Sequence, residues 1–390
     1  MIYLDNSATT WPKPPGVKEA MVTFMEEVGA NPGRSGHRLS IEAARVMYEA
    51  REALATLFHA KDPLRIVFTL NATESINLAL KGLLRPGDHV ITSSMEHNSV
   101  MRPLRHLEGD GIELTVIPCS SEGTLNPEDV EKKIKSNTRM VVLTHASNVT
   151  GTLLPIREVG AVTRKHNLFF LVDSAQTAGA CPIDMDKDEI DLLAFTGHKS
   201  LYGPQGTGGL VVGERVHEKE MIPLKEGGTG SRSEFEEQPD FLPDCFESGT
   251  PNGPGIAGLL AGLQFVLKEG IEKIRQQEGR LIKKLLVGLR ELPGVNLYGP
   301  ENRNQQIATL SFNIEGRTPS DVSTHLEREF SILCRPGLHC APAAHRTLGT
   351  FPEGTVRFSL GAFNTEDEVN SVINAVTELS KVERRRQNVE

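Results

Sequence analysis

The sequence predicts an α/β protein whose core is a mostly parallel β-sheet of seven strands. From about residue 66 to residue 212, short runs rich in β-branched residues alternate with amphipathic helical stretches. This alternation is typical of parallel strands joined by helices that cover both faces of the sheet. Two of the apolar runs also end near residues that carry chemistry, Asp173 and Lys199. Ligands of such sheets bind outside the carboxyl ends of the strands, so we expect these two side chains to share one crevice.

The elements follow from this pattern in order. Residues 40–58 predict a long helix with Ser40 as its N-cap. The expected strands of the sheet are 66–69, 89–92, 113–117, 140–144, 169–172, 192–195 and 209–212, with helices at 73–83, 127–135 and 156–166.

Beyond the last of these strands the sequence changes character. Residues 227–254 are rich in Gly, Pro, Ser and Glu, and a loop of this length is usually functional or part of an interface. Helices are expected at 255–269 and 271–291, followed by a strand–helix–strand–helix pattern from 307 to 382. We therefore predict a large α/β domain at 16–262 and a smaller C-terminal α+β domain at 263–390, with residues 1–15 packing near the small domain.

Composition narrows the class of protein. The 390-residue chain has a net charge of -9. A nucleic-acid-binding protein normally has a basic face, so we expect no nucleic-acid partner. It contains no apolar run long enough to span a bilayer, and its first residues lack the pattern of a signal peptide, so we expect a cytoplasmic protein without a membrane partner. The five cysteines are irregularly spaced and form no C-x-x-C pair, which supports neither a disulfide framework nor a cysteine-rich metal site.

An acid and a lysine in one crevice suit pyridoxal 5'-phosphate. The lysine forms a Schiff base with this cofactor, and the acid pairs with its pyridinium nitrogen and keeps the ring an electron sink. The alternative is a buried ion pair beside a glycine turn. The cofactor also needs an anion site, and the turn before the expected helix 73–83 provides a helix N-terminus with the Thr73 hydroxyl. Capping of that helix by Asn71 or Thr73 would explain the same residues.

These residues lie within motifs that resemble the class V aminotransferase group of fold-type I pyridoxal phosphate enzymes, and within it the cysteine desulfurases. The resemblance runs from Tyr3-Leu4-Asp5-Asn6 to Arg357-Phe358-Ser359-Leu360. The motifs that carry it are Asn71-Ala72-Thr73-Glu74, Glu96-His97-Asn98-Ser99, Asn148-Val149-Thr150-Gly151, Val172-Asp173-Ser174-Ala175-Gln176, Thr196-Gly197-His198-Lys199 and Ser248-Gly249-Thr250-Pro251-Asn252.

The resemblance implies a role for each matching position. Lys199 would form the Schiff base, Asp173 would pair with the ring nitrogen, and Gln176 would hydrogen-bond the phenolic oxygen. His97 would stack on the ring and move protons. The phosphate would be held by Ala72, Thr73, Thr196 and His198, and by Thr250 of a neighbouring subunit, which implies a homodimer with shared active sites. Asn148 and Arg357 would bind the substrate carboxylate, although from the sequence alone Arg357 also fits an interdomain ion pair.

Cys340 determines which reaction the resemblance implies. It lies in the loop-like stretch Arg335-Pro336-Gly337-Leu338-His339-Cys340-Ala341-Pro342, which resembles the catalytic loop of group II desulfurases, where a histidine precedes the cysteine. A nucleophilic cysteine needs exposure and cationic neighbours. Arg335, His339, His345 and Arg346 are the expected ones. The alternatives are an inert buried thiol, the usual state of a free cysteine, and a zinc site of His339, Cys340 and His345 that lacks a fourth ligand. Cys334 is expected to be core.

The expected function is therefore desulfuration of L-cysteine to L-alanine, with a persulfide on Cys340 that passes to an acceptor protein. Three alternatives stay open: a selenocysteine lyase, a class V aminotransferase or epimerase without persulfide chemistry, and a non-enzymatic sulfur-delivery scaffold. Segment 227–247 differs from the group II enzymes, as does the stretch after Cys340.

Overall fold

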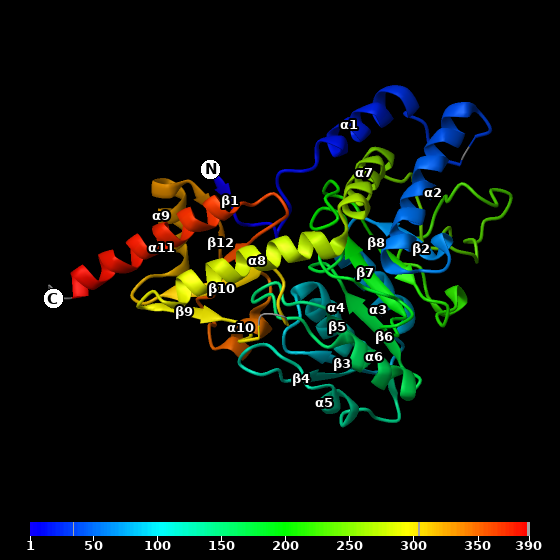
Figure 1. The fold of residues 1–390 in the computed structure, drawn as a ribbon. Coiled ribbons are helices and arrows are strands. Elements are labelled where there is room, and N and C mark those ends of the chain that lie inside the picture. The colour runs from blue at the N-terminus through cyan, green and yellow to red at the C-terminus, as the bar shows by residue number, and fades with distance from the viewer. Residues whose placement is uncertain (34, 303–304, 388–390) are drawn as a thin grey trace.

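The computed structural model describes residues 1–33, 35–302 and 305–387, and it is organised around two sheets (Figure 1). The larger sheet has seven strands, as the sequence predicts. In their order across the sheet they are β2 (Ile66–Thr69), β8 (Gly208–Val212), β7 (Leu192–Thr196), β6 (Phe169–Asp173), β5 (Thr138–Thr144), β3 (His89–Ser93) and β4 (Glu113–Ile117). Strands β7, β6, β5, β3 and β4 pair in parallel, and β8 runs antiparallel to both of its neighbours.

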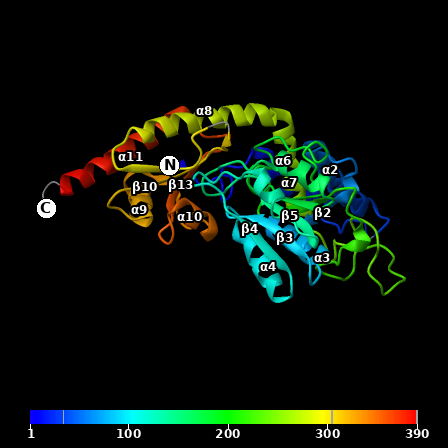
Figure 2. The same ribbon diagram turned by 90° about the horizontal axis from the view of Figure 1, so that it is seen from below.

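The strand residues that point to either face of this sheet are mostly apolar. Helices therefore cover both faces. One face packs against α3 (Ala72–Leu83) and α4 (Asn98–Gly109), and the other against α2 (Arg38–Phe58), α6 (Ile156–Lys165) and α7 (Gly253–Glu269). Figure 2 shows the two helical layers on opposite sides of the strands. The remaining elements near this sheet are α1 (Pro15–Thr23), the π-helix Phe24–Val28, the 3-10 turns Pro63–Arg65 and Glu218–Glu220, and α5 (Pro127–Glu131).

The smaller sheet is antiparallel, with the order β12 (Arg335–Gly337), β13 (Thr355–Ser359), β10 (Thr309–Ile314) and β9 (Val295–Tyr298). It packs against α8 (Ile271–Arg290), α9 (Pro319–Phe330) and α11 (Glu366–Gln387), with α10 (Pro342–Leu348) between β12 and β13. In Figure 1 the long helix α8 runs from the large sheet to the small one. The first strand, β1 (Ile2–Tyr3), pairs with β11 (Ile332–Leu333), so the start of the chain lies against the small sheet. The exact domain boundaries stay a prediction.

Two local predictions are wrong. His37, not Ser40, is the N-cap of α2, because the His37 side chain accepts a hydrogen bond from the Ser40 backbone N–H. The expected helix 127–135 ends at Glu131. The strand β9 was not expected, because its residues 295–298 are too few and too mixed in polarity to stand out.

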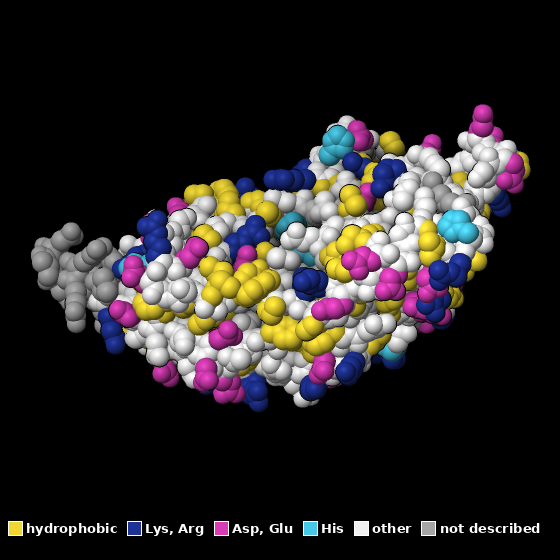
Figure 3. All heavy atoms as spheres, turned by 90° about the horizontal axis from the view of Figure 1, so that it is seen from above, with side chains coloured by type: hydrophobic (Ala, Val, Ile, Leu, Met, Phe, Trp, Pro, Cys, Tyr) yellow, Lys and Arg dark blue, Asp and Glu magenta, His cyan; other side chains and the backbone are white. Residues whose placement is uncertain are grey.

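The described residues include no helix with both the length and the apolar character needed to cross a membrane. On the face that Figure 3 shows, acidic side chains are interspersed with basic ones.

Candidate active site

A cavity lies at the carboxyl ends of β5, β6 and β7, the end of the sheet where α/β proteins bind ligands. Asp173 and Thr196 are the last residues of β6 and β7, and Lys199 follows three residues later. The residues expected from the sequence that line this cavity are Ala72, Thr73, His97, Asn148, Asp173, Gln176, Thr196, His198 and Lys199. The fold therefore brings together nine side chains from five separate segments of the chain.

Burial disfavours the charged forms of Asp173 and Lys199, and each of the two side chains partly opposes this effect in the other. Asp173 is 3% exposed, and burial raises the pKa of its carboxyl, although the Ala175 backbone N–H donates to Oδ1 over 2.9 Å. Burial also lowers the pKa of Lys199 to about 8, and the nearby Asp173 partly opposes this shift. A lysine with such a pKa has a substantial neutral fraction near neutral pH, which a nucleophilic amine requires.

One end of the cavity suits an anion. Asn71 caps α3 by accepting a hydrogen bond from the Glu74 backbone N–H over 3.0 Å, so the capping role falls to Asn71 and not to Thr73. Thr196 Oγ1 and His198 Nδ1 are buried and have no hydrogen-bond partner among the described residues. Buried polar atoms normally have partners, so these two atoms and the N-terminus of α3 mark the place of a polar occupant.

His97 is held as a neutral imidazole. Burial is the main cause that lowers its pKa to about 4, followed by the charge of Lys199. Its Nδ1 accepts a hydrogen bond from the Ser99 backbone N–H over 3.0 Å and so caps α4. The ring proton is therefore placed on Nε2.

The backbone before Lys199 is held by close contacts. A Cβ on Gly197 would lie 2.2 Å from Thr207 Oγ1, so only glycine fits between Thr196 and His198. Three groups of the N-terminal segment donate to the His198 carbonyl: Lys13 Nζ at 2.6 Å, Thr10 N–H at 3.1 Å and the Thr9 hydroxyl at 3.1 Å. No pattern in the sequence indicates this contact, because Lys13 and His198 are 185 residues apart.

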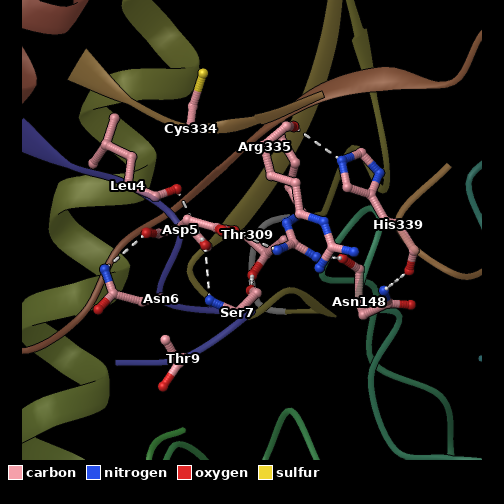
Figure 4. Close-up of polar contacts among 12 residues, drawn as sticks. Leu4, Asp5, Asn6, Ser7, Thr9, Asn148, Thr309, Cys334, Arg335 and His339 are labelled. Carbon is pink, nitrogen blue, oxygen red and sulfur yellow. Dashed lines mark hydrogen bonds and ion pairs between the residues drawn. The ribbon is translucent and has the colours of Figure 1, made fainter. Parts of the chain in front are cut away.

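The two residues expected to bind a substrate carboxylate contact each other. Arg357 lies on β13 and is fully buried, and its Nη1 donates to the Asn148 carbonyl over 2.9 Å. Its Nη2 donates to Asp5 Oδ1 over 2.6 Å (Figure 4). The Asn148 amide donates to the His339 carbonyl over 2.6 Å, which connects this pair to the cysteine loop. Asp5 was only part of a motif in the sequence, and nothing in its spacing pointed to Arg357.

Cys340 lies between β12 and α10, and it is the exposed one of the five free cysteines. Both His339 and Cys340 have a positive φ, at 50° and 57°. This left-handed backbone is uncommon outside glycine and is found in turns and functional loops. The Cys340 carbonyl accepts a hydrogen bond from the Asn98 backbone N–H, next to His97, over 2.8 Å. The loop is thus attached at two points to segments that line the cavity.

Four residues were expected to be cationic neighbours of Cys340, and Arg335 is the one that keeps this role in the structure. Arg335 Nη2 lies 3.7 Å from Cys340 Sγ. Burial lowers the pKa of His339 to about 2 and that of His345 to about 4, so both imidazoles are neutral and their rings stack on each other. The Arg346 guanidinium lies over the Phe351 ring instead. The described residues also contain no group of three or more His, Cys, Asp or Glu side chains that fits a metal ion, so a zinc site has no support.

The other cysteines differ clearly from Cys340. Cys334 packs against the core of the small sheet, as expected, and burial raises its pKa to about 12. Burial also raises the pKa of Cys119 to about 11 and those of Cys181 and Cys245 to about 12.

Thr250 does not line the Lys199 cavity of its own chain. It is exposed, and its hydroxyl accepts a hydrogen bond from the Asn31 amide over 3.2 Å. It lines a separate surface pocket formed by α2 and the loop before α7.

Comparisons with known proteins agree with this geometry. The family model for aminotransferase class-V matches residues 2–372. A probable cysteine desulfurase of Pyrococcus abyssi is 37% identical over 98% of this chain and 94% of its own length. Among solved structures, the apo cysteine desulfurase of Thermococcus onnurineus has a TM-score of 0.91 at 36% identity, over 97% of this chain and 94% of that chain. The Escherichia coli cysteine desulfurase CsdA, in an S-sulfonic acid form, has a TM-score of 0.87 at 30% identity over the same shares.

Proposed function

Because the chain belongs to the class-V aminotransferase family, whose cofactor is pyridoxal 5'-phosphate, we propose that it is a cysteine desulfurase that forms a persulfide on Cys340. The relatives and solved structures named cysteine desulfurase support the activity. The observation that carries the assignment to Cys340 is its exposure beside the Arg335 guanidinium, in a loop attached to the cavity of Lys199.

The residues of the cavity fit the cofactor. The unpartnered Thr196 Oγ1 and His198 Nδ1 lie near the N-terminus of α3, which together suit the phosphate. Asp173 suits a cationic ring nitrogen, because a positive partner would stabilise its buried carboxylate. When bound, the cofactor supplies an electron sink for bonds broken at the substrate carbon.

Lys199 and His97 are the proton carriers in this proposal. Lys199, with its pKa near 8, binds the cofactor and then accepts and returns a proton at Nζ. His97 lines the cavity as a neutral imidazole with its proton on Nε2, so it can donate a hydrogen bond without adding a positive charge. Arg357 and Asn148 orient the substrate through its carboxylate, since a guanidinium matches a carboxylate with two parallel hydrogen bonds.

Cys340 performs the sulfur transfer. Its thiolate attacks the sulfur of L-cysteine, a sulfur–sulfur bond forms, and the carbon–sulfur bond of the substrate breaks. The electron pair of that bond passes to carbon, which takes up the proton that Cys340 lost in forming its thiolate, and L-alanine leaves. The added sulfur is now a persulfide on Cys340, from which an acceptor thiol takes it.

The partners belong to the proposal as well. We infer a homodimer in which Thr250 of each chain reaches the cofactor phosphate of the other, which accounts for its position outside its own cavity. Sedimentation should then give about twice the mass of one 42.7 kDa chain. A cytoplasmic location suits five free cysteines, which stay reduced there, and cell fractionation tests it. The proposal also includes an acceptor protein that takes the sulfur from Cys340.

Mass spectrometry tests the central step. After incubation with L-cysteine, the Cys340 peptide of the wild type should gain one sulfur atom, which a reductant removes. Cys340→Ala should release L-alanine from L-cysteine at least about 100-fold more slowly, because it lacks the nucleophile. Cys334→Ala is the matched control and should keep both the added sulfur on Cys340 and the rate. Undiminished desulfuration by Cys340→Ala would exclude the persulfide mechanism, and activity restricted to selenocysteine would indicate a lyase.

A further inference from the structure

The guanidinium of Arg357 has an internal carboxylate partner in this structure. None of its side chain is exposed, whereas the side chain of Asp5 is 23% exposed. Arg357 Nη2 donates to Asp5 Oδ1, Nη1 donates to the Asn148 carbonyl, and Nε has no partner among the described residues. Asp5 and the Asn148 carbonyl therefore contact the same guanidinium. A carboxylate that binds the Arg357 guanidinium therefore comes close to Asp5.

A second carboxylate would have to share a nitrogen with Asp5. A guanidinium presents two forks of parallel N–H groups, one formed by Nε and Nη2 and the other by Nη1 and Nη2. Nη2 contributes one of its two N–H groups to each fork, and Asp5 accepts a hydrogen bond from this nitrogen. Two carboxylates around one buried cation also repel each other.

Asp5 nevertheless stabilises the empty site. Burial lowers the pKa of Arg357, and the charge of Asp5 is the first of the contacts that oppose this shift. A buried guanidinium without a counter-ion would be costly. The contact is therefore suited to the substrate-free state and unfavourable when another carboxylate arrives.

We propose that Asp5 is the resting counter-ion of Arg357, which the carboxylate of the amino-acid substrate displaces. Asp5 thereby sets how tightly the enzyme binds amino acids, and it does so through Arg357 without touching the reacting atoms. The inference rests on the proposed role of Arg357 as the carboxylate-binding residue.

The chain contains a built-in reporter for this displacement. Trp11 is its single tryptophan and lies six residues after Asp5 on the same N-terminal segment. The rings of Trp11 and Tyr3 are 5.7 Å apart, and the Tyr3 hydroxyl donates to the Asp5 carbonyl over 3.2 Å. Movement of Asp5 away from Arg357 should therefore alter the surroundings of the Trp11 ring.

The test compares the wild type with Asp5→Asn, both loaded with cofactor. L-alanine, which carries the carboxylate but no sulfur, is titrated while Trp11 emission is recorded. The asparagine keeps a hydrogen-bond acceptor for Arg357 but loses the charge, and charged hydrogen bonds are roughly twice as strong as neutral ones. We expect L-alanine to bind about three- to tenfold more tightly to Asp5→Asn. The KM for L-cysteine should fall by a similar factor, and kcat should change less than KM.

Two variants serve as controls. Asp110→Asn removes the same charge at the exposed end of α4 and should leave the affinity unchanged. Asp5→Glu keeps the charge and should bind L-alanine nearly as the wild type does, which covers the case in which Asp5→Asn folds poorly. An affinity for L-alanine that is unchanged or weaker in Asp5→Asn overturns the proposal. Binding of L-alanine involves no sulfur, so this result is independent of whether Cys340 forms a persulfide.

Discussion

The Lys199 cavity and the Cys340 loop differ in how firmly the fold holds them. The cavity lies at the ends of central strands whose residues are buried, and three donors fix the His198 carbonyl next to Lys199. The Cys340 loop belongs to the edge strand β12 of the small sheet, and its cysteine is exposed. Its backbone contacts with Asn98 and Asn148 attach it to the cavity.

This difference suits the two chemical steps, which are cofactor chemistry in the cavity and sulfur transfer at Cys340. Cofactor chemistry needs groups held in one geometry, and burial shifts their pKa values as that chemistry requires. A cysteine that takes sulfur from a substrate and passes it to another protein needs access from both sides. The rigid core thus serves the step common to the family, and the exposed loop serves the step that distinguishes this chain's proposed reaction.

The largest effect should come from Lys199→Ala. The variant loses the amine that binds the cofactor and moves protons, so we expect kcat/KM for L-cysteine to fall by at least about 1,000-fold. The visible absorbance of bound cofactor should shift or vanish. Lys61→Ala, which removes an exposed lysine paired with Asp186 and Glu214, should leave both unchanged. Retention of colour and activity in Lys199→Ala would contradict the cofactor assignment.

The same variant tests whether active sites are shared. A mixed dimer of one Lys199→Ala chain and one Thr250→Ala chain contains one site with both native residues. Activity at limiting cofactor should therefore recover on mixing and subunit exchange, above that of either variant alone. No recovery in a mixture shown to contain mixed dimers would place Thr250 outside the shared site.

A smaller effect, on stability, should come from substitution of Glu96, the residue before His97 of the cavity. Burial raises the pKa of this fully buried carboxyl from its ordinary value of 4.5 to about 8. It accepts hydrogen bonds from Ser93 Oγ and from the Thr144 backbone N–H, and neither of these partners is a cation. Between about pH 4.5 and 8 the folded state keeps a proton that the unfolded chain releases, so the free energy of unfolding falls as pH rises through this window.

Glu96→Gln should remove this dependence, because its amide is neutral throughout. Denaturant unfolding at pH 5 and pH 9 should show a difference between the two pH values that is smaller in the variant by roughly 3–5 kcal/mol. Glu19→Gln, at an exposed position on α1, should follow the wild type. An identical pH slope in Glu96→Gln would mean that Glu96 is ionised in the folded protein at neutral pH.

The sequence predicted the large sheet well because its strands are buried on both faces and read as apolar runs. Asp173 and Lys199 were predictable for a similar reason, since each follows such a run directly. The resemblance to a family supplied His97, Gln176 and Asn148, which no local pattern identifies. All three line the cavity.

Other features depend on contacts between distant segments and left no signal in the sequence. Asp5 and Arg357 are 352 residues apart, and only the folded chain pairs them. The prediction that His339 and His345 are cationic is wrong for a different reason. Proximity to Cys340 in sequence suggested cationic neighbours, but both rings are buried, and burial disfavours the charged form of an imidazole.

The smallest effect should come from loss of the contact between Arg335 and Cys340. A guanidinium 3.7 Å from Sγ favours negative charge on the sulfur, but the group is partly exposed, so water screens much of the interaction. Arg335→Leu should therefore slow alkylation of Cys340 by iodoacetamide only about two- to threefold at neutral pH. Arg346→Leu is the matched control, because that guanidinium lies over Phe351 and should not affect the rate. Equal slowing in both variants would mean that the loop as a whole, and not the Arg335 charge, sets the reactivity of Cys340.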